Sequence, residues 1–553
     1  MDDTVASAIS RGRRPGGEQQ VEFVSGISSG AKRIWVERPD PDGAAGAWCY
    51  TDRRSYRPGD QVSMFVSSTE PRVQVDITID DGRNRQVLDT TINTRFQSVP
   101  DAAYRDGCGW DVSLTYGIPW DADPGAYLVT LSCVDSRRVL GHHLFVVRPL
   151  APRKSAIALV LSTATWTAYN DWGGASHYYG IHPASVRGRS PELSTQRPWA
   201  RGQIWVPPGA PRIVNERRPD RPLPPRYESA EWAYLHGFSK YYASTGWATY
   251  ERHFVHWAER HGYVVDLLTQ DDLHFDDDPL GGYRCAVFVG HDEYWTDHMR
   301  RAVDAFVDDG GNIARFAGNF MWQIRLDRGG ERQIAHKYDA RETDPLRTVD
   351  RSAVTTAWED SWVGYPGAKT FGVNALRGMY AGFGAMAPRA ARGFVTFRPR
   401  HWAFAGTGLG YADMFGDESN VFGFEMDGVE YQFVDGLPEP THADGAPAGL
   451  QILAMNWATS AEDGLDEYRD DFMLGDADAQ FRAHVTEQTD AAGQDRARRT
   501  SGMVVYFERG SGRVFTAATC EWVCGLMKRD YYIETVTHNV LREFLAESAD
   551  ATP

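Results

Sequence analysis

Cysteine is scarce in this chain of 553 residues, which contains six, and no two of them form a CxxC pair. That scarcity argues against a disulfide scaffold and against a structural zinc ribbon. Long hydrophobic runs are also missing, and without about 18 consecutive apolar residues no membrane span is predicted. The N-terminus lacks the apolar stretch of a secretory signal, so the default prediction is a soluble cytoplasmic protein.

Positive charge is in deficit, because 58 Lys and Arg residues stand against 75 Asp and Glu residues, for a net charge of −17. A surface with this balance repels phosphate backbones, so nucleic-acid binding is not expected. Polyanionic substrates are disfavoured for the same reason, and neutral or cationic small molecules fit better. Aromatic residues make up 12% of the chain, which is enough for large cores and excludes global disorder.

At roughly 150 residues per domain, two to four domains are expected. The composition and the pattern of apolar residues change along the chain. Residues 1–20 are small, polar and charged, and predict a disordered tail. Residues 21–150 contain short β-like runs separated by turns such as Asp123-Pro124-Gly125. This pattern predicts an all-β, immunoglobulin-like sandwich. Residues 151–553 form the remaining part, which we expect to carry the chemistry.

Strand and helix signals alternate in the first half of that remaining part. Ala156–Ser162 and Cys285–Gly290 are continuous apolar runs, as expected for strands buried on both faces. A helix is predicted to begin after Thr296, a good N-cap, and Asn312–Gly318 is a further strand. The alternation predicts an α/β fold with a parallel sheet, Rossmann-like or glutamine-amidotransferase-like. Signals are weaker from 345 to 500, and a final hairpin is predicted within 503–518.

Polar side chains follow the predicted strands, and in open α/β sheets ligands bind outside the carboxyl ends of the strands. His291 follows the strand at 285–290, Asn319 follows the strand at 312–318, and Glu521 follows the final hairpin. Each has a structural alternative: the acids beside His291 could cap the next helix, and Asn319 could form an Asx turn. Glu521 lies in an apolar context, so it is either paired or has a raised pKa.

The usual catalytic signatures are missing. The turn at Gly290-His291-Asp292 carries no Cys or Ser nucleophile, and the motifs GxSxG, Walker A and HExxH do not occur. Six segments nevertheless follow one another in a specific order. They are 161–174, 271–274, 290–295, 317–323, 401–409 and 423–428. Together they resemble the large (beta) subunit of N,N-dimethylformamidase, over roughly residues 150–547. The lectin-like β region of that subunit is not recognised in this shorter chain.

The resemblance implies a mononuclear iron amidohydrolase, in which two tyrosinates and one glutamate hold Fe3+. Carried over by motif, the implied metal ligands are Tyr338, Tyr380 and Glu425. Phenol has a pKa of about 10, so two tyrosinates at neutral pH require a strongly Lewis-acidic cation. Hard oxygen ligands of this charge favour ferric iron. The structural alternative for each tyrosine is a buried, hydrogen-bonded phenol.

The resemblance also implies the remaining site residues. Glu521 is the expected general base, Asn456 the expected group that polarises or orients the amide, and His291 and Asn319 complete the candidate site. The implied reaction cleaves the C–N bond of small N-substituted formamides or amides to an acid and an amine. Metal-activated water is the nucleophile in this interpretation.

Two other functions stay open. The chain could be a non-catalytic binding or assembly module of the same fold, or a related hydrolase of a different amide. The resemblance further implies a small partner subunit and homo-oligomerisation. The aromatic and Pro-rich segment 199–250 could form such an interface, or it could cover the sheet.

Overall fold

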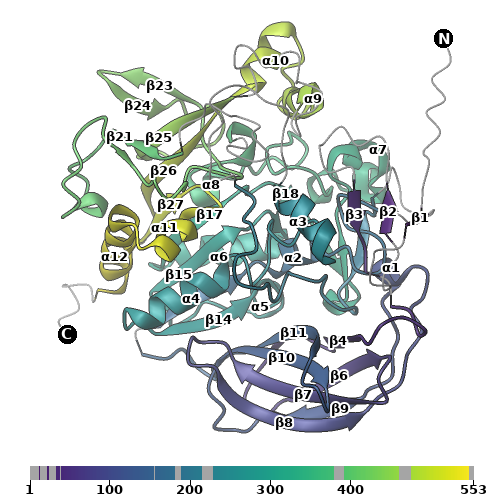
Figure 1. Ribbon diagram of the computed structural model, residues 1–553. Coiled ribbons are helices and arrows are strands. Elements are labelled where there is room, and N and C mark those ends of the chain that lie inside the picture. Colours follow the sequence, from purple (N-terminus) through teal and green to yellow (C-terminus); the bar gives the residue numbers. More distant parts are fainter. Residues whose placement is uncertain are drawn as a thin grey trace, which may run out of the picture.

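The computed structural model describes residues 11–12, 21–23, 33–37, 39–154, 156–180, 189–214, 228–378, 392–459 and 475–546. Figure 1 shows a small β-rich body at the bottom and a larger body of strands and helices above it. The tail predicted for residues 1–20 lies outside the described residues, except for the two-residue strand β1 (Arg11–Gly12). β1 pairs with β2 (Val21–Phe23), which pairs with β3 (Arg33–Trp35). Among the described helices, none has the length and apolar character needed to cross a membrane.

The lower body consists of two sheets that share one core. One sheet has the order β5 (Ser55–Tyr56), β11 (Val139–Val147), β10 (Gly125–Cys133), β7 (Arg72–Ile79), β8 (Arg85–Asn93). The other has the order β4 (Ala47–Thr51), β6 (Gln61–Ser68), β9 (Leu114–Gly117). The alternation of the sequence explains the packing: in β7, Val73, Val75, Ile77 and Ile79 are all buried. Successive side chains of a strand point to opposite faces, so these four point into the shared core.

The upper body is built on a mixed sheet of nine strands. Its order is β14 (Val265–Thr269), β12 (Ile157–Leu161), β15 (Cys285–His291), β17 (Asn312–Gly318), β27 (Gly512–Ala517), β26 (Arg499–Arg509), β25 (Gln451–Thr459), β21 (Phe394–Thr396), β22 (Met414–Phe415). The pairs from β14 to β27 are parallel. The pairs from β27 to β22 are antiparallel.

The predicted fold class, an α/β fold with a Rossmann-like or glutamine-amidotransferase-like parallel sheet, is therefore wrong. The described chain is rich in β-structure, spread over seven sheets, and its central sheet is mixed. The alternation of strands and helices in residues 156–318 does not extend to the rest of the chain. Beyond it, successive hairpin-like neighbours add four antiparallel strands to one edge of the sheet, where the sequence signals are weak.

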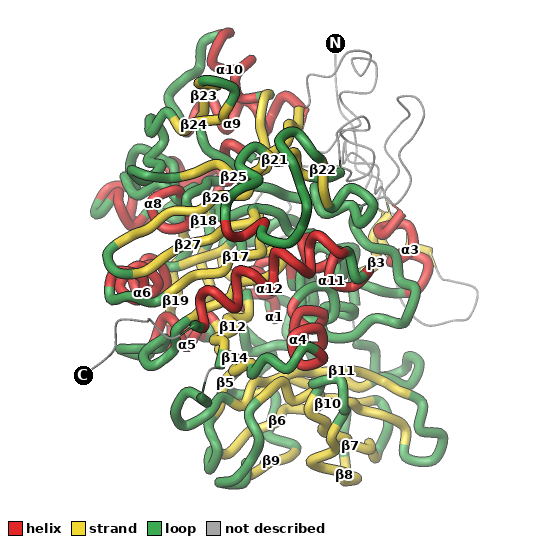
Figure 2. Tube along the Cα trace, turned by 90° about the vertical axis from the view of Figure 1, so that its left-hand side faces the viewer, coloured by secondary structure: helices red, strands yellow, loops and turns green. Residues whose placement is uncertain are grey.

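Helices cover both faces of the mixed sheet. The helices α4 (Glu251–Arg260), α11 (Trp522–Lys528) and α12 (Tyr531–Leu545) bury apolar residues in one core, and Figure 2 shows them in front of the strands. The helices α6 (Asp297–Asp308) and α8 (Ala368–Phe371) bury theirs in a second core on the opposite face. The described part of segment 199–250 packs into the first core through side chains such as Ile213, Phe238 and Trp247. It therefore helps to cover the sheet.

Several element predictions are confirmed. Thr296 caps α6, because its hydroxyl accepts a hydrogen bond of 3.2 Å from the backbone N–H of Met299. The final hairpin is the antiparallel pair of β26 and β27, in which Arg509 lies opposite Gly512. The other helices and strands are shorter or lie outside the mixed sheet. They are α1 (Ala103–Asp106), α2 (Thr163–Tyr169), β13 (Glu192–Ser194), α3 (Glu228–His236), α5 (Gln270–Phe275), β16 (Tyr294–Trp295), β18 (Trp322–Gln323), β19 (Arg325–Asp327), β20 (Arg332–Ile334), α7 (Ala340–Thr343), β23 (Tyr431–Val434), β24 (Leu437–Pro440), α9 (Gly475–Val485) and α10 (Ala491–Ala497).

Candidate functional site

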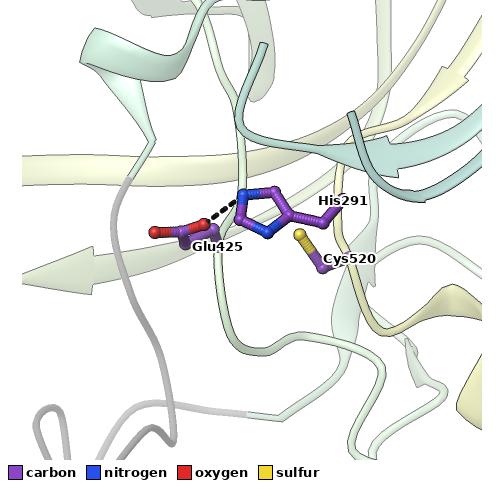
Figure 3. A group of neighbouring side chains, drawn as sticks. All are labelled: His291, Glu425 and Cys520. Atoms are coloured by element: carbon purple, nitrogen blue, oxygen red, sulfur yellow. Dashed lines mark ion pairs between the residues drawn. The ribbon is translucent and has the colours of Figure 1, made fainter. Parts of the chain in front are cut away.

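Three neighbouring strands bring polar side chains to one edge of the mixed sheet. His291 is the last residue of β15, Asn319 directly follows β17, and Cys520 lies just beyond β27. Glu425 joins them because the segment that carries it is held against the end of β27, through a bridge between Met426 and Thr519. The strands run parallel, so their carboxyl ends meet at the same edge. Figure 3 shows the imidazole of His291 between the carboxylate of Glu425 and the sulfur of Cys520.

His291 is the centre of this cluster and is almost fully buried. Its Nε2 lies 2.6 Å from Oε2 of Glu425 and 3.3 Å from Oε2 of Glu293. Its Nδ1 lies 2.9 Å from the carbonyl oxygen of Ser244. A carbonyl oxygen can only accept a hydrogen bond, so Nδ1 carries a hydrogen and donates it. Burial by itself would lower the pKa of His291, but the two carboxylates raise it well above its usual value.

Glu293 is the second buried carboxylate of the site, and aromatic side chains hold it. Tyr169 donates a hydrogen bond of 3.0 Å to Oε2, and Trp322 Nε1 donates one of 2.6 Å to Oε1. The hydroxyl of Tyr178 lies 2.6 Å from Oε2 and itself accepts a hydrogen bond of 2.7 Å from Tyr294. These donors are rigid rings, of which Tyr169 and Trp322 are buried and Tyr178 partly buried, so they fix the orientation of the carboxylate.

A buried lysine adds positive charge behind this carboxylate. Nζ of Lys337 lies 3.2 Å from the ring centroid of Tyr178 and 5.0 Å from that of Trp322. Burial would raise the pKa of Glu293, but His291, Lys337 and the Tyr178 hydrogen bond together lower it. Burial and the charge of Glu293 raise the pKa of Tyr178 well above its usual value. At neutral pH Glu293 is therefore a carboxylate and Tyr178 a neutral phenol.

A cavity of about 20 Å³ opens on both carboxylates. Its walls include Glu293, Glu425, Asn319, Tyr178 and Tyr338. A space of this size holds about one water molecule or one metal ion. Asn319 Nδ2 donates a hydrogen bond of 2.8 Å to Oε2 of Glu425, so the amide orients the carboxylate that faces the cavity.

A buried ion-pair group supports the cavity from behind. Arg315 on β17 donates two hydrogen bonds, of 2.8 and 2.6 Å, to Asp292, and its Nη2 lies 2.9 Å from Asp427. Asp427 in turn accepts a hydrogen bond of 2.8 Å from the backbone N–H of Asn319. All three charged side chains are fully buried. Because Asp427 lies two residues after Glu425, this group fixes the position of Glu425 relative to Asn319.

Backbone strain is concentrated at the same place. Asn319 has a φ of 65° and Phe424 a φ of 50°, which are left-handed conformations. Asn tolerates this region better than most residues, whereas a bulky phenylalanine adopts it rarely. Strain of this kind costs of order 1–3 kcal/mol and is typical of functional sites.

The structure brings together four of the residues that sequence patterns singled out. His291, Asn319 and Glu425 are in direct contact, and the half-exposed Tyr338 lines the same cavity. Tyr338 lies edge-on to Trp322, with ring centroids 5.0 Å apart. Tyr380, the other expected tyrosinate, lies outside the described residues.

Two further predicted residues do not line the cavity. Asn456 on β25 donates a hydrogen bond of 2.8 Å to the carbonyl oxygen of Gly393, which is a backbone-bracing contact. Glu521 is fully buried, and its carboxylate accepts hydrogen bonds of 3.0 and 3.2 Å from Arg212 and one of 2.9 Å from Tyr250. The sequence predicts that Glu521 is either paired or has a raised pKa. In the structure it is paired, with Arg212.

Sequence patterns gave no reason to select Tyr178 or Lys337. Tyr178 lies in a loop, and Lys337 has a left-handed φ of 59° at the start of a single 3-10 turn. Glu293 stood in the predicted group of strand-end residues, with helix capping as its alternative. Thr296 caps that helix instead, so Glu293 remains available to the cavity.

The donor set of the cluster fits a metal ion. One ligand atom each from His291, Glu425 and Cys520 lies within 4.8 Å of the other two. Burial and the nearby carboxylates raise the pKa of Cys520 well above its usual value, so its thiol is a poor ligand. The carboxylate of Glu425 and the phenol of Tyr338 are hard oxygen donors, and imidazole is compatible with many transition metals.

Comparison with known proteins supports one relationship. Residues 80–535 match a family model described as N,N-dimethylformamidase beta subunit-like, C-terminal. The match includes every residue of the cavity, and it begins within the lower body, at the end of β7. No curated protein matches the chain.

Proposed function

The chain belongs to the N,N-dimethylformamidase beta subunit-like family, and on that premise we propose that it is a metal-dependent amidohydrolase. Its substrates in this proposal are small neutral amides, such as N-substituted formamides, which it cleaves to an acid and an amine. The observation that carries the proposal is the cavity in which Glu425, Glu293, Asn319 and Tyr338 meet. A net charge of −17 is compatible with a neutral substrate.

In this proposal Glu425 and Tyr338 hold the metal, with His291 beside them and Tyr380 as the further tyrosinate implied by the family resemblance. Oxygen donors of this kind favour Fe3+. When bound, such an ion polarises a carbonyl group and lowers the pKa of a water molecule.

The protein's own residues supply the remaining functions. Glu293 accepts a proton at Oε2, because it lines the cavity and is a carboxylate at neutral pH. Tyr169, Tyr178 and Trp322 keep that carboxylate in one orientation. Asn319 orients Glu425 through its side-chain amide. The role of Glu521 as general base, and that of Asn456 as the group that orients the amide, stay predictions from the resemblance.

Metal analysis of the purified protein, with assay of a panel of N-substituted formamides and other amides, tests this function. We expect about one iron per chain, a visible tyrosinate-to-iron absorption band and release of amine. Glu425→Gln should lose both the metal and the activity. A folded, colourless, metal-free protein would contradict the proposal and favour a non-catalytic binding module. Activity confined to other amides would identify a related hydrolase.

The assignment of Tyr338 has a matched control in Tyr411, an exposed tyrosine whose hydroxyl donates to the carbonyl oxygen of Gly436. Tyr338→Phe should weaken the absorption band, and Tyr411→Phe should leave it unchanged.

The family description names a beta subunit, so we also propose a smaller partner chain. Homo-oligomerisation and a cytoplasmic location stay predictions.

A further inference from the structure

A second cavity lies at the junction of the lower and upper bodies, away from the site described above. Its volume is about 230 Å³. On one side it is bounded by β4 and β11, which form the upper edge of the lower body in Figure 1. On the other side it is bounded by residues 198–205 and by Phe238. We call it the junction cavity.

Aromatic rings form much of the wall of the junction cavity. Trp48, Trp199, Trp205, Phe238 and His142 all line it. His142 stacks on Trp205 with ring centroids 5.0 Å apart and an interplanar angle of 17°. Aromatic faces carry negative electrostatic potential, so a group of them around a small space favours an organic cation.

A carboxylate faces the same space. Oε1 of Glu37 accepts a hydrogen bond of 2.7 Å from Nε1 of Trp48, and this is the only hydrogen bond to Glu37 among the described residues. A carboxylate has about four lone-pair sites, so Oε2 can accept an N–H from a bound molecule. Burial raises the pKa of Glu37, and the opposing effects of Arg201 and the Trp48 hydrogen bond do not cancel that rise, so the carboxylate would gain from a further cationic partner.

Two basic side chains line the junction cavity and could compete with a bound cation. Burial, with a smaller contribution from Arg201, lowers the pKa of His142 to about 4, so its ring is neutral at pH 7. The guanidinium of Arg201 lies over the ring of Phe238, 5.1 Å from its centroid, and Arg201 is exposed to solvent. Solvent and salt screen an exposed charge far more than a buried one. Arg201 therefore offsets the charge of Glu37 only in part.

From these features we infer that the junction cavity is a binding site for a small protonated alkylamine. The ammonium N–H donates to Glu37, and the alkyl groups pack against Trp48, Trp205 and Phe238. Residues of the junction cavity make all of these contacts, so amine binding here does not depend on amide hydrolysis by the chain. If it does, the cavity binds the chemical class of the amine product at a place separate from the reaction.

Titration of the full-length protein with diethylammonium chloride at constant ionic strength tests the inference, followed by tryptophan fluorescence and calorimetry. Diethyl ether is the matched neutral probe, because it has the same shape without the charge or the N–H. We expect saturable binding of diethylammonium, and binding of the ether at least about ten-fold weaker. Equal affinity for the two probes, or no saturable binding of diethylammonium, would overturn the inference.

Substitutions in the junction cavity test whether diethylammonium binds there. Glu37→Gln keeps an acceptor for Trp48 and should weaken diethylammonium binding about ten-fold, and Trp205→Leu should weaken it similarly. Trp120→Leu is the control, because Trp120 is 77% exposed and does not line the cavity. If Glu293→Gln loses binding while Glu37→Gln keeps it in full, the amine binds in the cavity beside Glu293, and the inference is wrong. Circular dichroism of each variant separates loss of binding from loss of fold.

Discussion

Individual side chains decide which carboxylate can act on a substrate in this protein. Glu293 and Glu521 are both buried at strand ends, but their partners differ. Glu293 lines the cavity, where phenol and indole groups and the nearby His291 and Lys337 hold it, whereas Glu521 pairs with Arg212 and does not line the cavity. Glu521 therefore holds Arg212 in place, and Glu293 is the carboxylate positioned to act on a molecule in the cavity.

Comparison of Glu293→Gln with Glu521→Gln separates these two roles. Glu293→Gln should lower kcat by about 10²–10⁴-fold while metal content stays near that of the wild type, because it removes a proton acceptor. Glu521→Gln should lower the free energy of unfolding by about 1–3 kcal/mol, because it removes the charged hydrogen-bond partner of the partly exposed Arg212. Steady-state kinetics, metal analysis and denaturant unfolding measure the two effects. The opposite pattern would restore Glu521 as the general base.

Sequence patterns identified part of the residue-level site. His291 and Asn319 could be predicted because each follows a strand whose apolar run is easy to recognise. Glu425 and Tyr338 depended on the family resemblance, since neither lies in a periodic pattern. Tyr178 and Lys337 could not be predicted, because only loop conformation brings them next to Glu293.

Among the elements, the end of β17 controls the geometry of the site. A Cβ on Gly318 would lie 2.3 Å from the carbonyl oxygen of Glu425 and 2.8 Å from the backbone nitrogen of Cys520. Backbone atoms cannot move aside as a flexible side chain can. Glycine at this position therefore permits the close approach of the ends of β17 and β27 and the segment that carries Glu425.

Gly318→Ala tests this constraint. We expect a loss of about 1–3 kcal/mol in the free energy of unfolding, from overpacking, and a clear drop in metal content as Glu425 is displaced. Gly117→Ala is the control, because a Cβ there meets no atom within 4 Å. Thermal unfolding and metal analysis check both variants. Normal metal binding in Gly318→Ala would show that the position of Glu425 is not set by this contact.

At the scale of elements, strands with uniform apolar runs were predictable and the others were not. β12 and β15 are fully buried, so their sequences carry a strong signal. β22 has two residues, too few for any periodicity to identify it. The strands of the final hairpin carry a clear signal, but the pairing that joins β21 and β25 to that hairpin links segments far apart in the chain, and the fold class depends on that pairing.

At the scale of the whole molecule, a buried carboxylate of the lower body holds the two bodies together. Asp80 accepts hydrogen bonds of 2.8 Å from Trp247 and 2.7 Å from Arg252, and it lies 3.0 Å from His256. These three partners belong to the segment that leads into α4 and to α4 itself. Burial would raise the pKa of Asp80, but His256 and Arg252 lower it below its usual value.

Asp80→Asn should therefore destabilise the protein in a pH-dependent way. A carboxylate whose pKa is lowered on folding stabilises the fold above its ordinary pKa of about 4. That contribution is lost as the pH falls through the folded-state pKa. We expect Asp80→Asn to lose about 1.5–3 kcal/mol at pH 7, and to approach the wild type as the pH falls below 4.

Denaturant unfolding across this pH range measures the effect. Asp121→Asn is the control, because Asp121 is an exposed residue of the same body. A constant difference between Asp80→Asn and the wild type from pH 7 to pH 3 would contradict the assigned ion-pair group.

The sequence by itself determined the family, the buried parallel strands and the strand-end positions of His291 and Asn319. Those features depend on residue type and local order, which apolar runs and specific motifs record directly. The tertiary structure decided that the sheet is mixed, that Glu521 pairs with Arg212, and that Glu293 faces the cavity. Each of these depends on contacts between residues far apart in the chain, and such contacts leave no local pattern in the sequence.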